Sequence, residues 1–121
     1  MNHRTLLALI FAALAAATAA QAGGESMDAE IDYLLATVAA SDCVFIRNGK
    51  EYDGADAQKH LEMKRKRGRK YYDSSEEFIE RIASKSSWSG KPYRIRCGDG
   101  EENAGDWFSQ KLEQYRSNNS G

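Results

Sequence analysis

Cys43 and Cys97 constrain the fold of this chain more than any other feature, because they are its only cysteines and each adjoins a segment with β-strand composition. Residues 43–46 are β-branched and aromatic, and they are followed closely by the turn pair Asn48-Gly49. Residues 91–97 alternate well enough for a second strand and stop at a glycine-rich turn. We therefore expect two short strands.

The N-terminal segment determines whether the two cysteines can pair. Residues 1–22 combine a polar start that contains Arg4, an apolar stretch that is short for a bilayer span, and a small-x-small triplet that ends at Ala22. This order predicts a secretory signal peptide cleaved after Ala22. A retained membrane anchor is the alternative interpretation. The mature chain contains no second apolar run, so we expect a periplasmic or secreted protein without a transmembrane segment.

In an oxidising compartment, a lone pair of cysteines predicts one disulfide between Cys43 and Cys97. If these residues lie opposite each other in an antiparallel pair, Phe45 faces Ile95. A Cys/His metal site needs about four ligands, and His60 is the one histidine of the mature chain. We predict no metal and no cofactor.

Four helices are predicted around the two strands. Their signals are apolar residues at helical spacing and capping residues, such as Ser74 and Glu77 at capping-box spacing. The predicted helices cover residues 26–40, residues 54–66, a segment that begins at residue 73, and residues 104–116.

The expected fold is a small α+β domain with the element order α-β-α-α-β-α. About four helices pack on a two-stranded antiparallel sheet. The length of the mature chain predicts a single compact domain over residues 23–121, with a core of about 27–116 and frayed ends.

Residues 64–70 read KRKRGRK and carry six positive charges, although the net charge of the whole chain is −1. Removal of the signal peptide leaves 16 basic and 18 acidic residues, so nucleic-acid binding is not expected. Two interpretations stay open for this basic run. Acidic residues of the N-terminal third neutralise it within the fold, or it binds anionic envelope material such as lipid phosphates.

Three phrases of the sequence carry a family resemblance: FIRNG at 45–49, AQKHLEMK at 57–64 and EEFIERIASKSSWSGKPY at 76–93. Their order and spacing resemble the YfeK-like family of small exported bacterial proteins, whose function is unknown. The resemblance covers roughly residues 27–116. It implies a periplasmic setting and a compact helical domain with little sheet, and it implies no activity. The cysteine pair and most of the basic run lie outside the pattern.

One cluster of polar residues is the candidate site. His60 and Lys64 lie one helical turn apart, and the strand register brings the FIRNG and SGKPY phrases to the same end of the sheet. Cations, hydroxyls and turn N–H groups in one place suit an anion. Structural roles, such as a hydrogen-bonded core histidine, stay open for each member. The candidate ligand-binding residues, all of which match the family pattern, are Arg47, Asn48, His60, Lys64, Ser87 and Lys91.

These features favour a non-enzymatic periplasmic binding or interaction domain, whose partner the sequence does not name. An anionic small molecule or an envelope component fits the charges. The alternative is a small hydrolase or lytic accessory that uses His60 with a serine, although no nucleophile-elbow motif is present. If His60 binds an anion in its protonated form, affinity is expected to fall above about pH 6.5.

Overall fold

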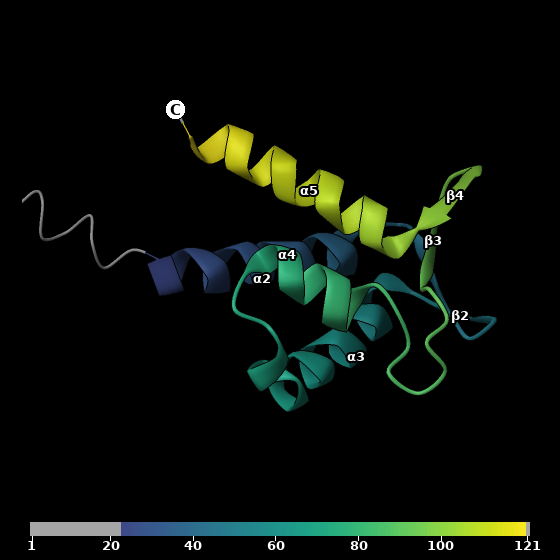
Figure 1. Ribbon diagram of the computed structural model, residues 1–121. Helices are drawn as coiled ribbons and strands as arrows, with labels where there is room; N and C mark the ends of the chain where they lie inside the picture. Colours follow the sequence, from purple (N-terminus) through teal and green to yellow (C-terminus); the bar gives the residue numbers. More distant parts are fainter. Residues whose placement is uncertain (1–22, 121) are drawn as a thin grey trace, which may run out of the picture.

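The computed structural model describes residues 23–120, so the predicted signal peptide over residues 1–22 lies outside the described residues. Helices α2 (Gly23–Ala40) and α5 (Ala104–Asn119) run along one another, and α3 (Gly54–Arg67) packs on the other side of α2 (Figure 1). The β-sheet lies at one end of these helices (Figure 1). The architecture is α+β, as predicted.

The sheet has four antiparallel strands in the spatial order β2-β1-β3-β4. The predicted central pair is confirmed, because Phe45 is the partner of Ile95. The strands are β1 (Val44–Arg47), β2 (Lys50–Tyr52), β3 (Arg94–Cys97) and β4 (Gly100–Asn103).

The predicted count of two strands is wrong, because each central strand continues into a hairpin. Asn48 and Gly49 both have positive φ angles, 51° and 80°, as a two-residue type I′ turn requires. In the second hairpin, Gly98 has a φ of 64° at the first turn position. The turn residues that were expected to stop the strands therefore reverse the chain and add β2 and β4 at the sheet edges.

A disulfide joins Cys43 and Cys97 across the central pair, with their Cα atoms 4.4 Å apart. This confirms the predicted pairing. The bond fixes the start of β1 to the end of β3, so Arg47 and Arg94 lie at the strand ends farthest from it.

The remaining helical segments lie between α3 and the second hairpin. A 3₁₀ turn, η1 (Arg69–Tyr71), precedes α4 (Ser75–Phe78), which continues into the π-helical turn η2 (Ile79–Ala83). The Ser74 side chain accepts a hydrogen bond from the Glu77 N–H at 3.1 Å, so the predicted cap is confirmed. No helix within residues 23–120 has both the length and the hydropathy needed to cross a bilayer.

Close contact between α2 and the start of α3 sets the position of the candidate site. A Cβ atom at Gly54 would overlap the Val38 carbonyl oxygen and lie 3.0 Å from that of Ala39. Only glycine allows this approach. From this anchored end, α3 extends along α2 and buries Leu61 in the core, which brings His60 and Lys64 toward the sheet.

Candidate anion-binding site

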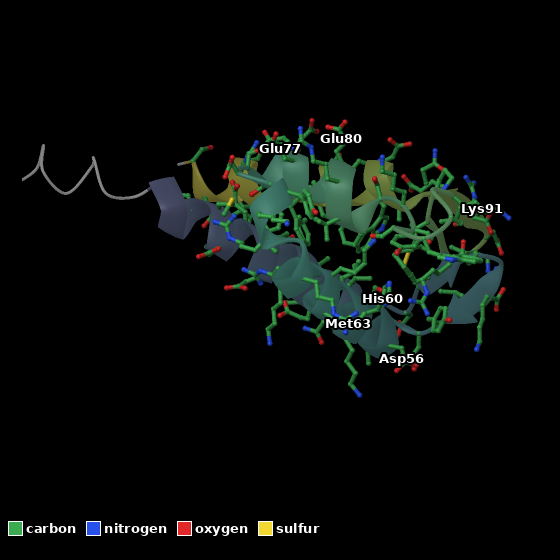
Figure 2. All side chains as sticks on the ribbon, turned by 60° about the horizontal axis from the view of Figure 1, so that its bottom comes forward. Asp56, His60, Met63, Glu77, Glu80 and Lys91 are labelled. Carbon is green, nitrogen blue, oxygen red and sulfur yellow. A yellow bond between two sulfur atoms is a disulfide. The ribbon has the colours of Figure 1, made fainter. Side chains whose placement is uncertain are left out.

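An open pocket of about 390 Å³ lies between α3, the β1–β2 turn and the loop that follows η2. His60 and Met63, one helical turn apart, lie close together on the α3 side (Figure 2). The pocket is lined by Arg47, Asn48, His60, Met63, Lys64, Arg67, Gly68, Tyr71, Ile82, Ser86, Ser87, Trp88 and Tyr93.

Lys64 is the buried cation of this pocket, with 8% of its surface exposed. Its Nζ donates hydrogen bonds to the Lys85 carbonyl at 2.8 Å and to the Tyr93 hydroxyl at 2.9 Å. Burial, reinforced by the charge of Arg47, lowers the pKa of Lys64 to about 8. An ammonium has three donors, so one N–H of Lys64 has no acceptor among the described residues.

Arg47 holds His60 in its neutral form. Its Nη1 lies 2.6 Å from Nδ1 and 2.9 Å from Nε2 of His60, and its Nη2 donates to the Tyr52 hydroxyl at 2.8 Å. A guanidinium can only donate, so a nitrogen of His60 must accept. Burial and the charges of Arg47 and Lys64 lower the pKa of His60 to about 4, in agreement with this requirement.

The neutral ring of His60 determines where the hydroxyl hydrogen of Tyr93 points. Nε2 of His60 lies 3.2 Å from the Tyr93 hydroxyl oxygen, and a neutral imidazole carries one N–H. We assign Nδ1, the nitrogen closest to Arg47, as the acceptor and Nε2–H as the donor to Tyr93. Tyr93 then accepts from both His60 and Lys64, and its own hydrogen has no acceptor among the described residues. Burial raises the pKa of Tyr93, which keeps this hydrogen in place.

The mouth of the pocket is held by hydrogen bonds between the β1–β2 turn and the loop after η2. The Asn48 amide donates to Ser86 Oγ at 3.3 Å and accepts from Ser89 Oγ at 2.6 Å. Ser86 Oγ also accepts from the N–H groups of Trp88 and Ser89, each at 3.2 Å. The FIRNG and SGKPY phrases thus meet, as the strand register predicts.

Lys91 is the predicted site residue that does not line the pocket. It is exposed and lies at the outer edge of the molecule, away from His60 (Figure 2). Its carbonyl accepts from the Ser86 N–H at 2.9 Å within the loop, and β3 begins only at Arg94. The loop therefore turns the Lys91 side chain outward. The other five predicted residues, Arg47, Asn48, His60, Lys64 and Ser87, all line the pocket.

Sequence reasoning missed Tyr93 and Tyr52 as parts of the site. The strand register puts Tyr93 beside Arg47, and this was the available signal. Tyr52 lies on β2, a strand that the sequence analysis did not predict, and its hydroxyl and ring both contact the Arg47 guanidinium.

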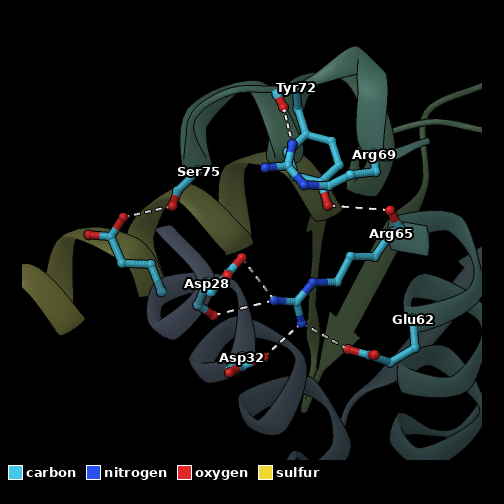
Figure 3. Close-up of polar contacts among 8 residues, drawn as sticks. Asp28, Asp32, Glu62, Arg65, Arg69, Tyr72 and Ser75 are labelled. Carbon is cyan, nitrogen blue, oxygen red and sulfur yellow. Dashed lines mark hydrogen bonds and ion pairs between the residues drawn. The ribbon is translucent and has the colours of Figure 1, made fainter. Parts of the chain in front are cut away.

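The basic run divides between the two sides of α3. Lys64 enters the pocket, whereas Arg65 turns to α2 and bonds Asp32 at 2.7 Å, with Glu62 and Asp28 beside it (Figure 3). For Arg65, the interpretation that N-terminal acids neutralise the run is supported. Arg69 donates to the Tyr72 carbonyl at 2.8 Å (Figure 3).

Comparison with known proteins gives a family but no activity. Residues 25–116 match a family of unknown function (DUF5329). Uncharacterized protein YfeK of Salmonella typhimurium is 39% identical over 67 residues, which span 54% of this chain and 56% of that relative. No solved structure shows significant similarity. Because the family match spans most of the chain, the resemblance seen in the sequence is confirmed, and the chain belongs to the family of unknown function DUF5329.

Proposed function

We propose that this protein is a non-enzymatic binding module whose pocket takes an anion. The observation that carries the proposal is Lys64, a nine-tenths buried ammonium with no carboxylate partner among the described residues. Burial of an unpaired charge costs free energy of folding, so a purely structural role does not explain why this ammonium is buried. A bound anion would supply the missing counter-charge.

The donors available for an anion converge at the floor of the pocket. These donors are the third N–H of Lys64 and the hydroxyl hydrogen of Tyr93. The atoms that carry them, Lys64 Nζ and the Tyr93 hydroxyl oxygen, lie 2.9 Å apart. Arg47 and Arg67 also line the pocket and add two further positive charges. A buried, preorganised set of donors binds an oxyanion more strongly than solvated surface charges do.

The hydrolase alternative receives less support from the same contacts. A serine nucleophile needs a histidine base within hydrogen-bond reach. Within the part of the chain that the structure describes, His60 shares its hydrogen bonds with Arg47 and Tyr93. The hydroxyl of Ser86 accepts from two backbone N–H groups of its own loop. We therefore favour binding over catalysis.

Binding of anionic envelope material through the basic run is also less favoured. Lys64 and Arg65 are directed into the fold, which leaves Lys66, Arg67, Arg69 and Lys70 exposed. Exposed charges of this kind are screened by salt. We propose export to the periplasm or beyond as the setting, with which the Cys43–Cys97 disulfide is compatible.

Calorimetric titration of the disulfide-bonded protein with sulfate tests the proposal, because sulfate keeps its charge over the whole pH range used. Affinity should fall as pH rises through about 8, where Lys64 loses its proton. We therefore expect the pH dependence of binding to follow the deprotonation of Lys64 and not that of His60, whose pKa is lowered to about 4. Equal affinity at pH 7 and pH 9.5 would contradict the proposal.

Two substitutions separate binding from folding. Lys64→Met should abolish sulfate binding, whereas Lys59→Met, which removes an exposed cation from the same helix, should not change it. His60→Ala should weaken binding more than it lowers the free energy of unfolding, because His60 orients the Tyr93 hydroxyl. Loss of stability with unchanged sulfate affinity would assign His60 a structural role only.

A further inference from the structure

We propose that the ligand of this pocket is an amphipathic oxyanion, with a carboxylate or phosphate head on a short apolar chain or ring. The inference rests on the proposed anion binding and adds the second half of the ligand. Among the described residues, three large hydrophobic side chains are exposed: Met63 at 38%, Tyr71 at 55% and Trp88 at 90%. All three line this one pocket.

Polarity changes with depth in the pocket. Lys64 and Tyr93 are buried at its floor, whereas Met63, Tyr71 and Trp88 are exposed at its mouth. A ligand that enters head first would place its charge against the floor and its apolar part against the mouth. A purely inorganic anion would leave the three apolar side chains in water.

Trp88 is held at the mouth of the pocket, where a ligand can contact its ring. The backbone N–H of Trp88 is bonded to Ser86 Oγ, which in turn accepts from the Asn48 amide. The loop that presents Trp88 is therefore fixed to the β1–β2 turn. Covering large aromatic and thioether surfaces is a main source of affinity in small-molecule sites.

The size of the pocket limits the apolar part of the ligand. Its volume of about 390 Å³ lies near the lower end of the range for small-molecule sites. A single ring or a chain of several carbons fits this space together with the head group. Long-chain lipids would extend beyond the mouth of the pocket.

Calorimetric titration with the series acetate, butyrate, hexanoate and octanoate at pH 7 tests the inference, with sulfate as the inorganic reference. Each methylene that reaches the mouth should raise affinity by up to about fourfold, so octanoate should bind at least about tenfold more tightly than acetate. Octanol, which lacks the charge, should bind more weakly than octanoate.

Variants assign the two halves of the ligand to the two parts of the pocket. Trp88→Ala should lower octanoate affinity several-fold, and by a larger factor than it lowers acetate affinity, whereas Gln114→Ala, an exposed position on α5, should change neither. Lys64→Met should lower both. Trp88 is exposed, so its removal should leave the protein folded.

The possible results distinguish this inference from the proposed function. Sulfate and acetate binding without a dependence on chain length would overturn the inference and leave anion binding in place. Failure of every anion, sulfate included, would overturn both. Octanol binding as tightly as octanoate would show an apolar site without charge recognition and would also overturn the inference.

Discussion

The Lys64 ammonium is held by one carbonyl and one hydroxyl, neither of which carries a charge. A pKa lowered from 10.5 to about 8 corresponds to about 3 kcal/mol in favour of the neutral amine. Between these two pH values the unfolded chain binds more protons than the folded one at this position. This residue therefore makes the free energy of unfolding rise with pH from about 8 to about 10.5.

Lys64→Met should remove this pH dependence. At pH 7 the free energy of unfolding should stay within about 1 kcal/mol of wild type, because the loss of two hydrogen bonds is offset by the loss of a buried charge. Urea unfolding of wild type, Lys64→Met and the control Lys59→Met at pH 7 and pH 10 measures both effects. A loss of more than about 3 kcal/mol at pH 7 would indicate that Lys64 serves the fold.

For single residues, the sequence predicts which side chains line the pocket better than it predicts their contacts. The i, i+4 spacing places His60 and Lys64 on one side of α3, and the structure confirms it. The outward turn of Lys91 could not be predicted, because it depends on hydrogen bonds within its own loop. The role of Tyr93 depends on the tautomer of His60, which the position of Arg47 determines.

The disulfide joins the two hairpins, and its contribution to stability can be predicted. Cys43 and Cys97 are 54 residues apart, and closing a loop of this length contributes roughly 4 kcal/mol in the chain-entropy model. Reduction should lower the free energy of unfolding by up to this amount. Urea unfolding with and without a reductant measures it, and the double variant Cys43→Ser/Cys97→Ser, which lacks the bond under both conditions, is the control. An unchanged midpoint after complete reduction would contradict the prediction.

The two edge strands, β2 and β4, are the elements that could not be predicted from the sequence. β2 reads KEY and β4 reads GEEN, and neither has the alternating apolar pattern by which a half-buried strand is found. Both lie at sheet edges, where charged residues discourage pairing with other chains. The Asn48-Gly49 pair was the available hairpin signal. The four helices, in contrast, begin within about three residues of their predicted starts, and the three with a predicted end stop within about three residues of it, because apolar spacing and caps are local.

Across the whole molecule, Arg116 ties together three helices that are distant in sequence. From α5 it bonds Glu30 of α2 at 2.7 Å and Glu76 of α4 at 2.8 Å. These bonds hold the pKa of both carboxyl groups below the ordinary value, and Ser75 adds a hydrogen bond to Glu30. The sequence gives no sign of this contact, because 86 residues separate Arg116 from Glu30.

Arg116→Met should lower the free energy of unfolding by about 1 kcal/mol at pH 7, as expected for a partly exposed network. A lowered carboxyl pKa contributes stability above the ordinary pKa, and this contribution is lost as pH falls below about 4.5. The difference between wild type and variant should therefore shrink from pH 7 to pH 3. Urea unfolding at both values measures it, with Lys59→Met as the control. A difference that is constant with pH would assign the effect to packing.

The disulfide also gives the chain a definite topology, that of a closed ring with two tails. Every residue that lines the pocket lies between positions 47 and 93, inside the ring that Cys43 and Cys97 close. Helices α2 and α5 are the tails, attached on either side of the bond. A single peptide-bond cleavage in the exposed loop at residues 87–91 would therefore open the ring without separating its pieces. The nicked protein would keep its full set of pocket residues on one covalent molecule until the disulfide is reduced.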